Sequence, residues 1–135
     1  AREMLRIMHE SNGVGLAAPQ VGWSVRLLVL NAGEEGSVDE VYVNPRIVRR
    51  RGKVVGEEGC LSFPGIYVQV ERAKEIDIEF QDEDGQIKTE TRADFRARIL
   101  QHEIDHLENV LLLHRMSPAD RVKYKHDLES LAGRT

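Results

Sequence analysis

The chain has little cysteine, few aromatic residues and no long apolar run, and each shortage excludes a class of protein. Its single cysteine, Cys60, excludes an internal disulfide, and a functional thiol survives best in a reducing compartment. We therefore expect the cytoplasm, or an organelle lumen of bacterial type. No apolar run approaches the roughly 20 residues that span a bilayer, and there is no charged-then-apolar leader, so a membrane role is not expected.

Charge and aromatic content argue against nucleic-acid binding. The net charge of −4 gives no general attraction to phosphates, and an aromatic content of 5% leaves few rings for base stacking. The one dense basic cluster is Arg49-Arg50-Arg51-Gly52-Lys53. We expect it at a solvated hairpin tip, with a phosphate contact as the open alternative. No specific DNA binding is expected.

The pattern of apolar residues predicts one domain of mixed structure. At 135 residues the chain is long enough to bury a core without covalent staples. Alternating or continuous apolar stretches predict strands near residues 25–30, 41–48, 66–71, 76–81 and 86–91, with an interruption at Asn44-Pro45. Helical spacing predicts helices over residues 2–10, about 93–108 and about 118–131.

The second of these helices carries the residues that indicate chemistry. His102 and His106 are four residues apart, so a helix presents both imidazoles on one face, with the Glu103 carboxylate at its edge. A thiolate from Cys60 would give a metal ion three protein ligands and leave one position open for water. This set of residues is typical of a metal-dependent hydrolase. Asp105 is not expected to bind the metal, and we expect it either beside the ligands or at the surface.

A glycine-rich element precedes both motifs in the chain. Gly13-Val14-Gly15-Leu16-Ala17-Ala18-Pro19-Gln20 formally fits a dinucleotide-binding pattern, which must follow a strand and open a helix. A helical pattern precedes it instead, and Pro19 and Gly22 break any helix after it. A turn that ends the first helix accounts for Gly13 and leaves Gly15 and Gln20 unexplained.

The three motifs Gly-Val-Gly-Leu-Ala-Ala-Pro-Gln, Glu-Gly-Cys-Leu-Ser and Gln-His-Glu-Ile-Asp-His-Leu occur here in that order. In this the chain resembles the peptide deformylases, metal hydrolases that remove the formyl group from the N-terminal methionine of nascent polypeptides. The resemblance implies that the metal ligands are Cys60, His102 and His106. It also implies that Glu103 transfers protons, and that the Gln20 side chain and the Leu61 N–H stabilise the oxyanion.

The resemblance has further implications for fold, substrate and cofactor. The fold would be α+β, with antiparallel strands packed around a central metal-binding helix, plus a C-terminal helix. One divalent ion is expected, Fe²⁺ in the cell, with Zn²⁺, Ni²⁺ or Co²⁺ as alternatives. Formylated nascent peptides would be the partners, with a weak contact to the ribosome. The substrate-binding residues would be Val14, Gly15, Gly59, Phe95 and Ile99.

The chain also departs from the family pattern. We expect residues 1–135 to form a single catalytic domain that lacks the N-terminal strand and the start of the first helix that family members usually carry. Asn109 stands where a glycine is common, and His114 stands where an aspartate is common. Both changes predict altered packing after the metal helix, with the metal motif intact.

Two other functions are open on the sequence alone. One is a zinc endopeptidase that takes its third ligand from a downstream residue such as His114 and cuts internal peptide bonds. The other is an inactive relative that binds metal or formylated chains without cleaving them.

Overall fold

The computed structural model describes residues 1–11, 13–33, 36–60, 63–108, 110, 115 and 119. Its elements, in chain order, are helix α1 (Arg2–Glu10), strand β1 (Gly15–Ala17), the 3-10 helix η1 (Ala18–Val21), strands β2 (Leu27–Leu30), β3 (Glu40–Arg51), β4 (Val54–Cys60), β5 (Phe63–Arg72), β6 (Glu75–Gln81) and β7 (Ile87–Ala93), and helix α2 (Asp94–Leu107). The expected helix at about 118–131 lies outside the described residues. In the part described, no helix is long and apolar enough to cross a membrane.

All the strands pair antiparallel, in two sheets. Five form a sheet of order β1-β2-β3-β6-β7, and β4 pairs with β5. The β3–β6 ladder ends with Arg51 opposite Glu75, and the β4–β5 ladder begins with Val54 opposite Arg72. The two ladders are therefore one long ribbon that bends at residues 52–53 and 73–74, which we call the elbow. We call β4 and β5, beyond the elbow, the arm.

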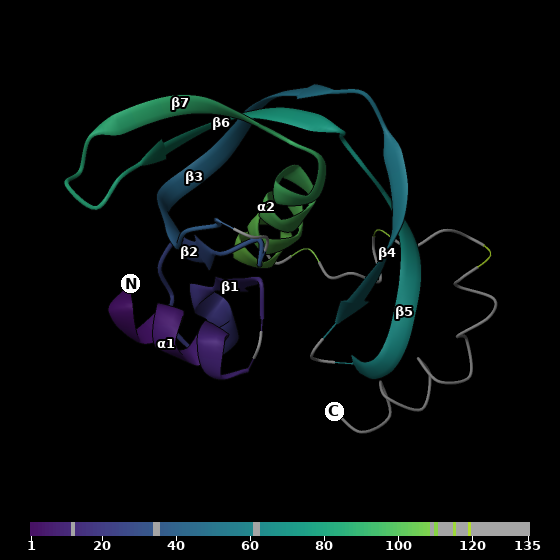
Figure 1. Ribbon diagram of the computed structural model, residues 1–135, viewed down its shortest axis with the longest axis horizontal. Helices are drawn as coiled ribbons and strands as arrows, with labels where there is room; N and C mark the ends of the chain where they lie inside the picture. Colours follow the sequence, from purple (N-terminus) through teal and green to yellow (C-terminus); the bar gives the residue numbers. More distant parts are fainter. Residues whose placement is uncertain are drawn as a thin grey trace.

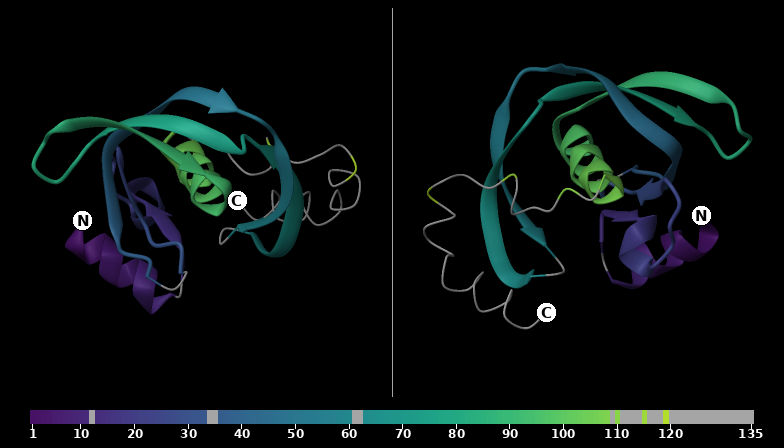
Figure 2. Two further views of the ribbon diagram at one scale, coloured as in Figure 1. Left: turned by 45° about the horizontal axis from the view of Figure 1, so that its top comes forward. Right: turned by 180° about the vertical axis from the view of Figure 1, so that it is seen from behind.

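The ribbon curves around α2 (Figure 1). Seen from in front, from above and from behind, α2 lies inside the curve, with β1 and β2 on one side and the arm on the other (Figure 2). Buried α2 residues point in several directions, as expected for a helix between layers: Ala97, Ile99, Leu100, Gln101, Glu103, Ile104 and Leu107. This confirms the predicted α+β class with a central helix.

Strand β2 is buried because both its faces are covered. Leu28 and Leu30 pack with α2 residues in one hydrophobic cluster, whereas Val29 packs with Met4 and Met8 of α1 in a second. Successive side chains of a strand point to opposite faces, so a continuous apolar run is what this position requires. β6 has the alternating burial predicted from its sequence.

Strand β3 differs from the prediction. It continues through Asn44 and Pro45, and the irregularity is taken up by a register shift between Val43 and Arg46 and by a positive φ of 49° at Asn44. A proline cannot donate to the ladder, and asparagine tolerates the left-handed region, so a bulge replaces the expected break.

The basic cluster was expected at a hairpin tip, and this was wrong. Arg49 to Arg51 lie in β3, and Gly52-Lys53 belongs to the elbow, because β3 and β4 pair with β6 and β5 and not with each other. Arg51 donates both Nη atoms to the two carboxylate oxygens of Asp77 at 2.8 Å, across the β3–β6 ladder. The arginines therefore form part of a sheet, and Arg51 is held there by a bidentate ion pair.

Candidate metal centre

Helix α2 presents His102, Glu103 and His106 to a cavity that residues of β1 and β4 also line. The Nε2 atoms of His102 and His106 are 3.3 Å apart. One ligand atom from each of the three residues can be chosen so that all lie within 4.8 Å of one another, close enough to hold one metal ion. The four-residue spacing on a helix produces this arrangement, as predicted from sequence.

Glu58 of β4 orients His102. Oε1 of Glu58 lies 2.7 Å from Nδ1 of His102. Because a carboxylate accepts only, the imidazole donates there, and neutral His102 then has its lone pair on Nε2, toward His106. Burial opposes a charge on His102, but the hydrogen bond to Glu58 and the charge of Glu103 outweigh it and raise the pKa of His102.

Burial also shifts the pKa values of His106 and Glu103. Burial, assisted by the positive field of His102, lowers the pKa of His106 to about 4, so its ring is neutral near pH 7. Burial raises the pKa of Glu103 to about 7. Within the described part of the chain, Oε2 of Glu103 is the one buried side-chain oxygen or nitrogen without a hydrogen-bond partner.

These features fit a divalent cation. Two imidazole lone pairs can face the same point, and imidazole suits iron, nickel, copper and zinc. A buried carboxylate oxygen with no donor is costly unless a positive charge or a water molecule meets it. A cation at this point would relieve that cost, so the residues present fit a metal ion.

The predicted third ligand, Cys60, is the last residue of β4. Its backbone lies opposite Phe63, after an irregularity between Gly59 and Cys60. Its side chain, Leu61 and His114 lie outside what the structure describes, so the thiolate ligand, the oxyanion role of the Leu61 N–H and the exclusion of His114 remain predictions. The structure does bring the neighbouring Glu58 and Gly59 into the wall of the site.

The glycine-rich element places Gln20 next to the histidines. Its side-chain oxygen accepts a hydrogen bond from the Ala17 N–H at 2.8 Å, across the first turn of η1. Its Nε2 lies 3.5 Å from Nε2 of His106. Because the oxygen is held by Ala17, the amide N–H groups are directed at the site. This accounts for a glutamine that the turn alone does not need.

A cavity of about 350 Å³ opens beside these groups. Its lining includes Gln20, His102, Glu103 and His106, together with all five residues expected to bind substrate: Val14, Gly15, Gly59, Phe95 and Ile99. A Cβ at Gly15 would lie 2.8 Å from Cγ2 of Ile99 and 3.0 Å from Cγ of Glu103. Such distances are closer than van der Waals contact, so the approach of β1 to α2 requires glycine.

Sequence reasoning missed the roles of Glu58 and Arg98. Arg98 of α2 lines the same cavity and donates to Glu58 and to the carbonyl oxygens of Val54 and Val70. The available signal was a second glutamate directly before Gly59-Cys60. In the ladder that glutamate lies opposite buried Val68, a position where a solvated charge is not expected.

Comparisons with known proteins give the family of the chain. The model of the polypeptide deformylase family matches residues 1–122. Among curated relatives, the peptide deformylase of Chlorobium luteolum is 43% identical over 133 residues, 96% of this chain and 70% of the relative. That of Thermotoga maritima is 43% identical over 130 residues, 96% of this chain and 77% of the relative.

Solved structures agree as well. Peptide deformylase 1B of Arabidopsis thaliana superposes with a TM-score of 0.91 at 40% identity, over 98% of this chain and 75% of that one. The peptide deformylase of Thermus thermophilus gives a TM-score of 0.88 at 42% identity, over 99% of this chain and 80% of that one. The chain belongs to the peptide deformylase family.

Proposed function

We propose that this chain is a metal-dependent hydrolase that removes the formyl group from N-formylmethionine at the start of nascent polypeptides. The observation that carries the proposal is the meeting of His102, Glu103, His106 and Gln20 at one cavity, in a chain of the deformylase family. Each of these residues supplies a group that amide hydrolysis needs: imidazoles for a metal, a carboxylate for protons and an amide donor.

His102, His106 and the Cys60 thiolate are the residues proposed to hold the metal. Fe²⁺ is the proposed ion in the cell, with Zn²⁺, Ni²⁺ or Co²⁺ as substitutes, because a Cys/His/His set suits several ions of intermediate softness. When bound, such an ion supplies Lewis acidity that lowers the pKa of a water molecule to about 7.

Glu103 is proposed to carry the proton. Burial raises the pKa of Glu103, and a cation beside the carboxylate would lower that pKa again. A carboxylate balanced in this way can accept a proton near neutral pH and give it up again. As the water oxygen bonds to the formyl carbon, the water proton passes to Glu103. When the carbon–nitrogen bond breaks, the same proton goes to the amine nitrogen, and formate and a free N-terminus are the products.

Gln20 and the Leu61 N–H are proposed to hold the oxygen of the formyl group as it becomes negative. A donor that is fixed before the reaction stabilises this charge without reorganising. The hydrogen bond between Ala17 and the Gln20 oxygen supports this for the side-chain amide, because it fixes the orientation of the donor.

The cavity and the strands beside it fit an extended peptide with an apolar first side chain. β1 and β4 are both edge strands, so each has an edge that pairs with no other described strand. Val14 and Phe95 are 36% and 44% exposed, which leaves apolar surface at the cavity for a methionine side chain.

We propose the cytoplasm as the location, or an organelle lumen, and a weak contact with the ribosome.

Hydrolysis of formyl-Met-Ala-Ser tests the function. The metal-loaded protein, kept anaerobic because ferrous iron is oxidised in air, is expected to release formate from this peptide and none from its acetylated counterpart. Formate release is measured enzymatically, and new N-termini are measured by amine labelling. Cleavage of an internally placed bond in a blocked peptide would instead favour an endopeptidase. Binding of the formyl peptide without formate release would favour an inactive relative.

The ligand set is tested by changing Cys60 to alanine. We expect this variant to lose most of its metal and to melt at a lower temperature, because metal binding energy is coupled to folding. Metal content is measured by mass spectrometry after gel filtration. His114→Ala is the matched control and should keep its metal. Full metal content with unchanged melting in the Cys60 variant would remove Cys60 from the site, and metal loss in the His114 variant would point to the endopeptidase.

A further inference from the structure

The two sides of the proposed metal site belong to different parts of the fold. His102 and His106 lie on α2, whereas Glu58 and Cys60 lie on the arm, beyond the elbow of the ribbon. Among the described residues, neither hydrophobic cluster contains a side chain of the arm. Val68 and Val70 of β5 are buried but belong to neither cluster, so polar contacts between the arm and α2 contribute to the position of the arm.

Two arginines join the arm to α2: Arg98 reaches from α2 to the arm, and Arg72 reaches from the arm to α2. Arg72 is the one that carries the inference. It lies at the end of β5, next to the elbow, and its side chain is 5% exposed. Its Nε and Nη2 donate to the two carboxylate oxygens of Glu58 at 2.9 and 2.8 Å, and its Nη1 donates to Oδ2 of Asp105 on α2 at 2.6 Å. One planar guanidinium thus joins the residue that orients His102 to the helix that carries His102.

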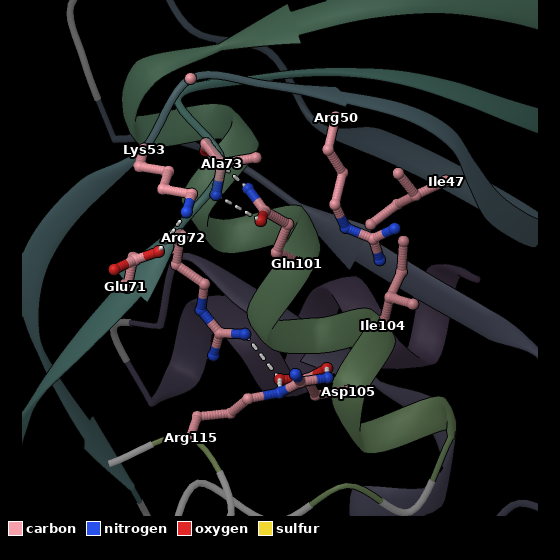
Figure 3. A pocket seen from close by; sticks show the side chains of 11 residues that line it. Ile47, Arg50, Lys53, Glu71, Arg72, Ala73, Gln101, Ile104, Asp105 and Arg115 are labelled. Atoms are coloured by element: carbon pink, nitrogen blue, oxygen red, sulfur yellow. Dashed lines mark hydrogen bonds and ion pairs between the residues drawn. The ribbon is translucent and has the colours of Figure 1, made fainter. Parts of the chain in front are cut away.

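The elbow itself is also attached to α2. Figure 3 shows Gln101 reaching Ala73, with Arg72 and Arg115 converging on Asp105, around a cavity of about 470 Å³ on the inner side of the elbow. Gln101 accepts from the Ala73 N–H and donates to the Ala73 carbonyl, each at 2.9 Å. These contacts fix where the ribbon bends, and Arg72 is the side chain among them that also reaches Glu58.

A buried ion pair of this kind does little for net stability. Removing the charges of Arg72 and Glu58 from water is costly, and the bidentate geometry offsets that cost. What such a pair provides is a defined geometry, because a shifted arm would leave both charges buried without partners.

We propose that Arg72 is a positioning residue that sets the arm against α2, so that Glu58 meets His102 and the end of β4 reaches the metal site. The proposal rests on the proposed function only in taking His102 as a metal ligand. The contacts of Arg72 with Glu58 and Asp105 do not depend on which substrate the protein hydrolyses.

The test compares zinc binding by the parent and by Arg72→Met, which keeps an unbranched side chain that is shorter than arginine and removes the guanidinium. We expect the zinc Kd, measured by competition with a chromogenic chelator well below the melting temperature, to rise roughly 10- to 100-fold, the usual effect of losing a group that orients a ligand. The proton NMR signal of the His102 Nδ1–H should broaden or disappear, because Glu58 loses its bidentate partner Arg72 and, of its arginine partners, keeps only Arg98.

Arg92→Met is the matched control. Arg92 is another arginine with carboxylate partners and is 14% exposed, but its partners are Glu40, Glu90 and Tyr42, away from the metal site. The Arg92→Met variant should have a lower melting temperature than the parent, with the zinc Kd and the His102 Nδ1–H signal unchanged. If Arg72→Met lowers the melting temperature in the same way and its zinc Kd stays within about threefold of the parent, Arg72 is only structural and the proposal is wrong.

Asp105→Asn and Arg72→Lys keep the test open if Arg72→Met does not fold. Each variant keeps a polar group in place and loses part of the contact between Glu58, Arg72 and Asp105. Lysine cannot donate two hydrogen bonds to Glu58 and also reach Asp105 in the way the guanidinium does. Both should raise the zinc Kd in the same direction by a smaller factor, and an unchanged Kd in both overturns the proposal. Absence of formyl hydrolysis by the parent would contradict the proposed function and leave these zinc measurements interpretable.

Discussion

Glu103→Gln should retain the metal and lose on the order of 10²–10⁴ in turnover, the usual contribution of a positioned acid or base. The amide has nearly the shape of the carboxylate, so the buried position, which is 5% exposed, remains filled. It cannot take a proton from water near neutral pH, and that is the step assigned to Glu103.

The measurement is formate release under saturating formyl-Met-Ala-Ser, with metal content determined on the same sample. Glu108→Gln is the control, because it makes the same chemical change at the exposed end of α2, where Glu108 contacts Arg26. It should behave as the parent. Metal loss from the Glu103 variant would make Glu103 a ligand, and a variant as active as the parent would refute the mechanism.

The sequence predicted the elements whose patterns are local. α2 follows its apolar spacing and β6 follows its alternation, because each is determined by which face of that element is buried. The continuous course of β3 could not be predicted in this way. Asn44-Pro45 is locally a breaker, and only the pairing with β6 on both sides shows that a bulge keeps the strand together.

The candidate site likewise contains residues that a local pattern predicts and residues that only the tertiary fold brings together. His102, Glu103 and His106 lie within about one turn of the same helix, so the spacing alone brings their side chains close together. Glu58 is 44 residues from His102, and its role depends on the bend of the ribbon, which no local pattern specifies. The same holds for Arg72, which is 33 residues from Asp105. Gln20 was assigned through resemblance, and the structure adds the physical reason for its orientation.

Gln20→Leu should keep metal and substrate affinity near those of the parent while kcat falls by roughly 10²–10³, the scale for one lost oxyanion donor. The variant removes two things at once, the amide donor near His106 and the oxygen that accepts from the Ala17 N–H. Gln20→Glu separates them. A carboxylate oxygen can still accept from Ala17, but it offers no donor and repels the developing anion.

Both variants should therefore be poor catalysts, with Gln20→Glu the closer of the two to parental folding. Steady-state kcat and KM on formyl-Met-Ala-Ser and a melting curve for each variant give the comparison. A rise in KM with kcat preserved would show that Gln20 only binds substrate. If Gln20→Glu kept the parental kcat while Gln20→Leu lost it, the hydrogen bond to Ala17 alone would matter. Gln20 would then shape η1, and the oxyanion would depend on other donors.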